Sequence, residues 1–456
     1  MARLCLLFAC AASAPNVVLF LTDDQDQLLG GSFPIGESGS TPMPKTQELL
    51  VQRGMTATRF YAHTPICCPS RAQLLTGRYF HNLRAPPGTP HCMHVDLEKV
   101  HDFTFLRRLQ EEAGYTTGLF GKYLNTMPST PPAGIDVFMA NDGGNYISPE
   151  FTVQGIDFGG FRWPNGTWHG TTEDYTTALV GNLSEAWIRS VAKQGRPFFA
   201  YVAPKAAHEP FNPAPWRTLM SVDDVVGAVV GLCEELGLMD NIYFFYTSDH
   251  GFQLGEFNII MDKRQPYEWD TKVHLVVRGP GIPEASHLEA LATMVDLAPT
   301  FLGLAGLSAG TDGKSLVPLL VSGKSPAATK AHLASMPADY KWRNSVLLEY
   351  YFNDPNIKCV SNCTAKYDYP NEDSFCGDLY NGEHCWMCAD DCYATESPHN
   401  NWIALRSTAQ STFGDTTYVE FETGMQDSQN ITFDSPDFFE IETLHSHFKC
   451  AGDECP

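Results

Sequence analysis

The chain has 456 residues, of which 43% are apolar and 12% aromatic, so it is not a disordered chain and has enough apolar residues for a large core. Its 30 basic and 53 acidic residues give a net charge of −23, which argues against nucleic acid as a partner, because phosphate binding needs clustered Lys and Arg. The acidic balance suits an acidic compartment, and it equally suits simple solubility.

The first fourteen residues, MARLCLLFACAASA, combine one basic residue, a short apolar run and a small-residue end. This pattern predicts a secretory signal peptide over residues 1–14, and no other apolar run is long enough to span a bilayer. The chain also has 14 cysteines and N-x-S/T sequons that start at Asn165, Asn182, Asn362 and Asn430. Together these features predict a glycoprotein of the secretory pathway, either lysosomal or extracellular.

Two continuous apolar runs predict strands that are buried on both faces, and each run ends in acidic residues. The run NVVLFLT leads into Asp23 and Asp24, and the run IYFFY is followed closely by Asp249 and His250. Carboxylates are hard oxygen ligands of the kind that Ca2+ and Mg2+ prefer, and adjacent carboxylates repel each other unless a cation or a proton intervenes. The alternative is that one acid caps the next helix while the other faces water.

Helical and strand patterns alternate along the first two thirds of the chain. Residues 217–237 place apolar side chains at helical spacing, and Gly237 is expected to end that helix. Further strand candidates are residues 117–120, 198–202 and 273–277. This alternation predicts an α/β fold with a mostly parallel central sheet sandwiched by helices. Ligands gather at the carboxyl ends of strands in such sheets, which is where both acidic sites lie.

Two adjacent cysteines, Cys67 and Cys68, begin the run CCPSRAQLLTGR. Neighbouring cysteines can hardly bond each other without strain, so each thiol pairs elsewhere, stays buried and inert, or acts as a nucleophile. Pro69 suits the first turn of a helix, and Gly77 suits its end. A helix N-terminus favours negative charge and Arg71 lies one turn on, so Cys67 is placed where an anionic nucleophile or substrate is stabilised.

This run resembles the C-x-P-S-R-x-x-x-L-T-G-R signature of the sulfatase family. The resemblance implies an alkaline-phosphatase/sulfatase-like α/β fold. It also implies that a formylglycine-generating enzyme reads the C-x-P-S-R stretch before folding and oxidises Cys67 to formylglycine (3-oxoalanine). Cys68 then fills the variable position of the signature and is left out of the cysteines that are expected to form disulfides.

Other segments resemble the family's segments in the same order. PNVVLFLTDDQD and TSDHG are similar to its metal-binding segments, which implies that one Ca2+ binds Asp23, Asp24, Cys67, Asp249 and His250. GKYLN, APKAAHEPF and MDKRQPYEWDTKV are similar to its sulfate-binding segments, which implies substrate contacts by Lys122, Asn125, His208 and Lys263. The catalytic residues implied by the resemblance are Cys67, Arg71, Lys122 and His208.

The implied chemistry explains why these residue types are needed. An aldehyde binds water to form a geminal diol, one hydroxyl of which attacks sulfur while the other later expels sulfate. The cation acts as a Lewis acid, and positive side chains neutralise the charge on the sulfate oxygens. His208 is the expected general acid for the leaving sugar oxygen.

The segments CCPSR, GKYLN and DKRQPYEWDTKV most resemble the N-acetylglucosamine-6-sulfatase branch, so the expected substrate is a sulfated carbohydrate with a 6-sulfate on N-acetylglucosamine, as in glycosaminoglycans. The alternatives are an arylsulfatase or another polysaccharide sulfatase. A phosphoesterase of the same superfamily would use Ser or Thr with zinc and would need more histidines near Asp249. A non-enzymatic alternative is an inactive glycan-binding homologue. Tyr123, Leu124 and Asn125 stand where many relatives place a histidine, and the stretch HEPFNPAPW between His208 and the next helix is short.

The expected domains are the catalytic domain over residues 15–350 and a smaller cysteine-rich C-terminal lobe over residues 351–456. The lobe has eight cysteines, at Cys359, Cys363, Cys376, Cys385, Cys388, Cys392, Cys450 and Cys455. Their C-x3-C and C-x2-C spacings are compatible with zinc, but the secretory features favour disulfides, whose connectivity is not readable from sequence. The runs YVEF and FFEI are strand candidates in this lobe.

Overall fold

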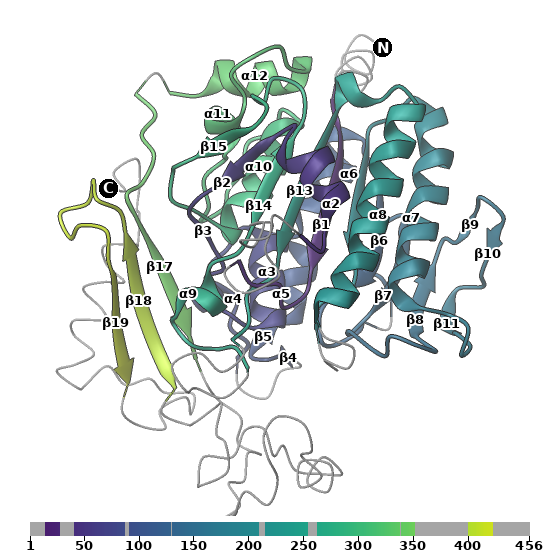
Figure 1. Cartoon of the computed structure of the whole chain (residues 1–456), viewed down its shortest axis with the longest axis horizontal. Helices are drawn as coiled ribbons and strands as arrows, with labels where there is room; N and C mark the ends of the chain where they lie inside the picture. The colour runs from purple at the N-terminus through teal and green to yellow at the C-terminus, as the bar shows by residue number, and fades with distance from the viewer. Residues whose placement is uncertain are drawn as a thin grey trace, which may run out of the picture.

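A ten-stranded mixed sheet forms the centre of the computed structural model, which describes residues 14–27, 41–86, 91–128, 130–208, 215–253, 262–337, 339–351 and 400–422. Its strands are β1 (Asn16–Thr22), β2 (Met55–Ala57), β6 (Thr116–Lys122), β7 (Val137–Asn141), β8 (Glu150–Gln154), β11 (Gly166–His169), β12 (Phe198–Ala203), β13 (Ile242–Ser248), β14 (Leu275–Arg278) and β15 (Ser286–Leu288). Their order across the sheet is β11-β8-β7-β6-β12-β1-β13-β14-β2-β15 (Figure 1). The central strands β7, β6, β12, β1 and β13 are parallel, and antiparallel pairs flank them on both sides. The predicted α/β class is confirmed.

Helices cover both faces of this sheet. The α-helices of the described residues are α2 (Pro44–Thr46), α3 (Cys67–Thr76), α4 (Phe80–Leu83), α5 (Leu97–Asp102), α6 (Phe105–Ala113), α7 (Thr176–Val191), α8 (Pro215–Glu235), α9 (Glu268–Thr271), α10 (Leu297–Leu304), α11 (Val317–Leu320) and α12 (Ala327–Ser335). Successive side chains of a strand point to opposite faces. Accordingly Val17 and Leu19 of β1 join a core shared with α3, α6 and α10, whereas Val18 and Phe20 join a core shared with α7 and α8. Strand β1 is therefore buried on both faces, as its apolar run predicts.

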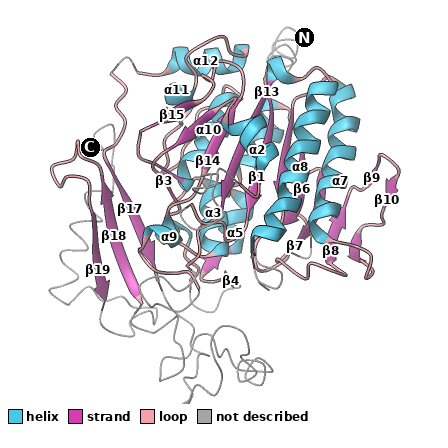
Figure 2. Cartoon of the chain, viewed as in Figure 1, coloured by secondary structure: helices cyan, strands magenta, loops and turns pink. Residues whose placement is uncertain are grey.

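A second, three-stranded antiparallel sheet stands beside the main one and contains β17 (Ser345–Tyr350), β18 (Asn401–Ser407) and β19 (Thr417–Glu422) (Figure 2). We call it the C-terminal sheet. The run YVEF lies in β19, so that strand prediction is confirmed, whereas β17 and β18 were not predicted. Strand β17 precedes the expected boundary at residue 350 and pairs with β18 beyond it.

Short two-stranded pairs complete the fold: β3 (Phe60–Tyr61) with β16 (Ala292–Thr293), β4 (His91–Cys92) with β5 (Val95–Asp96), and β9 (Asp157–Phe158) with β10 (Phe161–Arg162). Among the described residues, none of the helices combines the length and apolar character needed to cross a bilayer. The expected signal sequence up to residue 13, the eight cysteines of the tail and the run FFEI lie outside the described residues, as does most of HEPFNPAPW.

Candidate active site

The acidic residues that follow β1 and β13 meet at one edge of the sheet. These two strands are adjacent and parallel, with Thr22 opposite Ser248, so the residues that follow them are neighbours in space. The backbone N–H of Asp24 donates to Asp249 Oδ1 at 3.2 Å, and both carboxylates are buried. The predicted convergence of the two acidic strand ends is present in the structure.

Helix α3 brings Cys67 to this edge. Its N-cap residue, Ile66, has an extended backbone, and the helix ends at Gly77, whose φ of 68° is the left-handed conformation that glycine adopts without strain. Every residue of the helix is buried. The Cys67 Sγ lies 3.8 Å from Asp23 Oδ1 and 3.4 Å from His250 Nε2, so the predicted nucleophile position lies among the predicted metal ligands.

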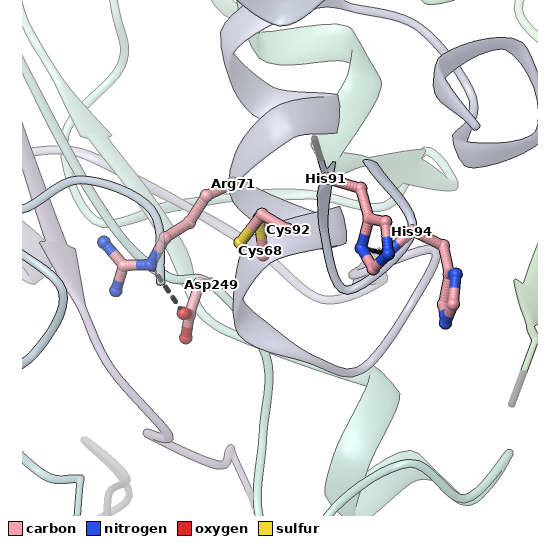
Figure 3. Close-up of a disulfide and its surroundings, with 6 residues drawn as sticks. All are labelled: Cys68, Arg71, His91, Cys92, His94 and Asp249. Atoms are coloured by element: carbon pink, nitrogen blue, oxygen red, sulfur yellow. Dashed lines mark hydrogen bonds and ion pairs between the residues drawn. A yellow bond between two sulfur atoms is a disulfide. The ribbon is translucent and has the colours of Figure 1, made fainter. Parts of the chain in front are cut away.

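Arg71 joins the acids of both strands. Its Nε donates to Asp249 Oδ2 at 2.8 Å (Figure 3), and its guanidinium lies 3.5 Å from Asp23 Oδ1. Its Nη1 also donates to the carbonyl oxygen of Lys122 at 2.9 Å. Because Arg71 has no exposed surface, it holds the two carboxylates in a fixed relation.

Two buried lysines bind the carboxylates of this group. Lys122, the last residue of β6, donates from Nζ to Asp23 Oδ2 at 2.6 Å. Lys263 donates from Nζ to both oxygens of Asp24, at 2.7 and 2.9 Å, and lies 3.6 Å from Cys67 Sγ. Two ammonium groups therefore stand where negative charge at residue 67 or on a ligand would be compensated.

The two predicted histidines also contact the acids. His250 is buried, and its ring nitrogens lie 3.4 Å from Asp24 Oδ1 and 3.6 Å from Asp249 Oδ2. His208 is half-buried, with its Nε2 3.8 Å from Asp24 Oδ2. Burial lowers the pKa of His208, but the charges of Asp24 and Asp23 outweigh burial and raise that pKa above its usual value. His208 is thus biased toward its protonated, proton-donating form.

Asn125 is the one predicted site residue for which the structure gives no contact with this group. It is half-buried, and its Oδ1 has no hydrogen-bond partner among the described residues. We call the other nine the charged cluster: Asp23, Asp24, Cys67, Arg71, Lys122, His208, Asp249, His250 and Lys263.

The electrostatics of the charged cluster favour an anion at residue 67. Burial raises the pKa of the Cys67 thiol, but Lys122 and Lys263 outweigh burial and hold that pKa well below its usual value. Burial raises the pKa of Asp249 to about 6, even though His250 opposes the shift. Burial lowers the pKa of His250, but Asp249 and Cys67 outweigh it and raise that pKa to about 9.

The donor atoms are close enough together to hold a metal ion. Ligand atoms of Asp23, Cys67, Asp249 and His250 all lie within 4.8 Å of one another, and a second such group contains Asp23, Asp24, Cys67 and His208. Carboxylates outnumber the other ligand types, which suits a hard divalent cation. The residues present therefore fit the expected cation.

A disulfide joins Cys68 to Cys92 directly beside the charged cluster (Figure 3). The expectation that Cys68 forms no disulfide was therefore wrong. Successive helix residues point about 100° apart, so the side chain of Cys68 leaves the charged cluster and enters the core that contains Cys92. Beyond the expected signal peptide, Cys92 and Cys233 were the two cysteines outside both the signature and the cysteine-rich tail, and spacing did not show which of them pairs with Cys68.

The comparisons with known proteins agree with this geometry. Residues 15–307 match the family model described as Sulfatase. The N-acetylglucosamine-6-sulfatase of Homo sapiens is 30% identical over 480 residues, an alignment that covers 91% of this chain and 78% of the relative. That of Capra hircus is 29% identical and covers 90% of this chain and 76% of its own. The structure of BT4656, solved with its substrate D-glucosamine-2-N,6-O-disulfate, superposes with a TM-score of 0.60 at 19% identity and covers 94% of this chain and 96% of its own.

The chain belongs to the sulfatase family. The structural likeness, which covers 94% of this chain, shows the same fold. The protein is accordingly an enzyme, a sulfuric ester hydrolase, and its chain spans about three quarters of the length of the mammalian relatives.

Proposed function

We propose that this protein removes the 6-sulfate of N-acetylglucosamine in glycosaminoglycans and that its nucleophile is a formylglycine made from Cys67. The observation that carries the proposal is the position of Cys67, which lies 3.6 Å from the Lys263 ammonium and among three carboxylates, one of which binds Lys122. The names of the human and goat relatives support the choice of sugar and of sulfate position.

The metal ligands in this proposal are Asp23, Asp24, Asp249 and His250, together with residue 67, and the ion is one Ca2+. When bound, the cation supplies Lewis-acid polarisation of a sulfate oxygen and favours the deprotonated form of a nearby hydroxyl. Arg71 keeps Asp23 and Asp249 together through the ion pairs described above.

The other residues bind the sulfate group and move a proton. The hydrated aldehyde of formylglycine supplies the attacking hydroxyl. Lys122 and Lys263 bind sulfate oxygens and neutralise the charge that builds up on them. His208, whose pKa is raised, donates a proton to the sugar oxygen that leaves. Asn125 contacts the sugar.

The maturation of the site sets a further requirement. Conversion of Cys67 needs a formylglycine-generating enzyme, and in this proposal the chain meets it in the secretory pathway on the way to the lysosome or the extracellular space. The Cys68–Cys92 disulfide supports an oxidising compartment.

Peptide mass spectrometry across Cys67, on protein purified from secretory cells, tests the nucleophile. An aldehyde at residue 67 is expected, and a quantitatively unmodified thiol in protein that still releases sulfate would overturn the assignment.

A substrate panel tests the sugar. Sulfate release is expected from N-acetylglucosamine 6-sulfate at chain ends and much less from N-acetylgalactosamine 6-sulfate or an aryl sulfate. Turnover of the aryl sulfate alone would identify an arylsulfatase. Tight binding of sulfated glycans without turnover, with the aldehyde present, would identify an inactive glycan-binding homologue.

A further inference from the structure

Strand β18 of the C-terminal sheet contacts the backbone next to Lys263. The indole Nε1–H of Trp402 donates to the carbonyl oxygen of Arg264 at 2.9 Å. The side-chain amide of Asn400 donates to the same oxygen at 3.3 Å. Both donors belong to buried residues, and Arg264 directly follows Lys263 in the chain. One carbonyl beside Lys263 is thus held by two side chains from more than a hundred residues away.

The backbone at Lys263 needs such support because no helix or strand contains it. Asp262 forms an isolated bridge with Gln253, and regular structure resumes only at α9. Arg264 has a φ of 93°, a conformation that residues with a Cβ rarely adopt and that persists only where surrounding contacts enforce it.

A second contact joins β18 to the same segment. Arg406 lies four residues after Trp402, so both side chains are on one face of the strand. Its Nε donates to the hydroxyl of Tyr61 at 3.0 Å, and that hydroxyl donates to Glu268 at 2.8 Å. Strand β18 therefore contacts the chain both directly after Lys263 and again in α9.

We propose that Trp402, assisted by Asn400, is a positioning residue of the active site that holds Lys263 in place through the Arg264 carbonyl. A fixed carbonyl fixes the preceding residue, so the Lys263 ammonium stays 2.7 Å from Asp24 and 3.6 Å from residue 67 instead of sampling other rotamers. Both residues lie beyond the 15–307 segment that matches the family model. The inference rests on the proposed function in one respect, the binding of sulfate by Lys263.

The first test compares two tryptophan-to-phenylalanine variants of the full-length protein. Trp402→Phe keeps an aromatic ring but loses the N–H donor. The matched control is Trp342→Phe, because Trp342 Nε1 donates to the Leu291 carbonyl at 2.7 Å, outside the charged cluster. We expect Trp402→Phe to lower kcat/KM by about tenfold and to weaken inhibition by inorganic sulfate, as the loss of one buried hydrogen bond allows. The control should lose thermal stability to a similar degree and keep its kcat/KM and its inhibition by sulfate. Equal kinetics in the two variants would overturn the proposal.

A double-mutant cycle separates positioning from general destabilisation. Calorimetry measures the binding of inorganic sulfate to the native protein, Trp402→Phe, Lys263→Met and the double variant, so no turnover is needed. If Trp402 acts through Lys263, its substitution weakens sulfate binding severalfold in the native background and has almost no effect once Lys263 is methionine. Independent, multiplicative losses would overturn the positioning role. Unchanged sulfate binding in Lys263→Met would overturn both the positioning role of Trp402 and the proposed sulfate binding by Lys263. Multiplicative losses would overturn the positioning role alone.

Asn400→Ala provides a second variant in case Trp402→Phe does not fold. It removes the weaker donor to the same carbonyl, and a loss of about twofold to threefold in kcat/KM is expected, again only where Lys263 is present. An unchanged kcat/KM in a folded Asn400→Ala protein would show that Asn400 does not assist Trp402. If Asn400→Ala lowered kcat/KM by the same factor in the native and the Lys263→Met backgrounds, the positioning proposal would be overturned.

Discussion

The charged cluster and the C-terminal sheet are built in opposite ways. The charged cluster gathers carboxylates, lysines and an arginine where water is excluded, which costs free energy unless every charge is paired. The C-terminal sheet presents an apolar face, in which Val346, Leu348, Tyr350, Trp402 and Ala404 pack together. That face also contacts Ile66, the residue directly before Cys67. The charged cluster is thus packed against a region that contributes none of its nine residues.

The proposed chemistry and the structural support of the site therefore lie in different parts of this chain, the first in the charged cluster and the second in the C-terminal sheet. Substitutions in the charged cluster should abolish turnover, whereas substitutions at its supports, such as Trp402 and the Cys68–Cys92 disulfide, should lower stability and reduce turnover only in part. The variants below test this separation, from the largest expected effect to the smallest.

Cys67→Ala should lower kcat by more than about a thousandfold, because it removes the proposed nucleophile. Its thermal stability should stay close to that of the native protein. The control is Cys233→Ala, which removes the other free buried cysteine among the described residues, in α8. Sulfate release and thermal unfolding are measured on both. Substantial activity in Cys67→Ala would show that another group attacks sulfur.

Removal of the Cys68–Cys92 disulfide should mainly lower the stability of the folded protein. It closes a loop with a sequence separation of 24 residues, so Cys92→Ala should lower the free energy of unfolding by about 3 kcal/mol. Denaturant unfolding measures the loss. Cys68→Ala and the double variant should lose the same amount, since one bond is removed in each case, and a clearly larger loss in the double variant would contradict that reading.

The contact between the C-terminal sheet and the main body should weaken in acid because of His63. Its Nδ1 is hydrogen-bonded to the carbonyl of Leu347 in β17, and its Nε2 is buried without a partner among the described residues. Burial lowers the pKa of His63 to about 4, against an ordinary value of 6.5. Because the unfolded chain binds the proton first, stability is fully present above pH 6.5 and falls as the pH drops toward 4, by up to about 3 kcal/mol.

Unfolding experiments between pH 7.5 and pH 4 check this slope. His63→Gln cannot titrate, so its stability should depend less steeply on pH than that of the native protein, even if it starts lower. Identical slopes for the two proteins would exclude His63 as the cause.

The smallest effect is expected at the surface. Arg189 of α7 forms a two-pronged ion pair with Glu235 of α8, at 2.7 and 3.0 Å, and both side chains are exposed. Arg189→Gln should change kcat/KM by less than about twofold and shift the unfolding midpoint only slightly, because exposed pairs are screened by water and salt. A large change in either quantity would mean that this helix pair is coupled to the site.

The sequence predicted that the residues of the charged cluster lie together, because each of them stands in a short stretch with a recognisable pattern. Asp23 and Asp249 follow apolar strands, and parallel strands bring their carboxyl ends to one edge. Cys67 and Lys263 lie in runs whose order matches a known family. These are local signals, and the structure brings the residues that carry them together.

The supporting contacts had no such signal. The bond from Trp402 to Arg264 spans 138 residues and joins an indole to a backbone carbonyl, a pairing that any tryptophan can make. The pairing of Cys68 with Cys92 depends on which way successive side chains leave α3, and cysteine spacing does not reveal that. Strand β18 was not predicted either; it pairs with β17, more than fifty residues away, and with the predicted β19.

The complete burial of α3 has a consequence for anyone who produces this protein. Residue 67 sits in the first turn of a helix with no exposed side chain, locked to a hairpin by the neighbouring disulfide, so a modifying enzyme has no access to it in the folded molecule. Because the proposed function requires formylglycine at residue 67, it predicts that a preparation from a host that lacks that enzyme stays inactive however well it folds. Adding the enzyme after purification would not restore it, so the choice of expression host decides the outcome before purification begins.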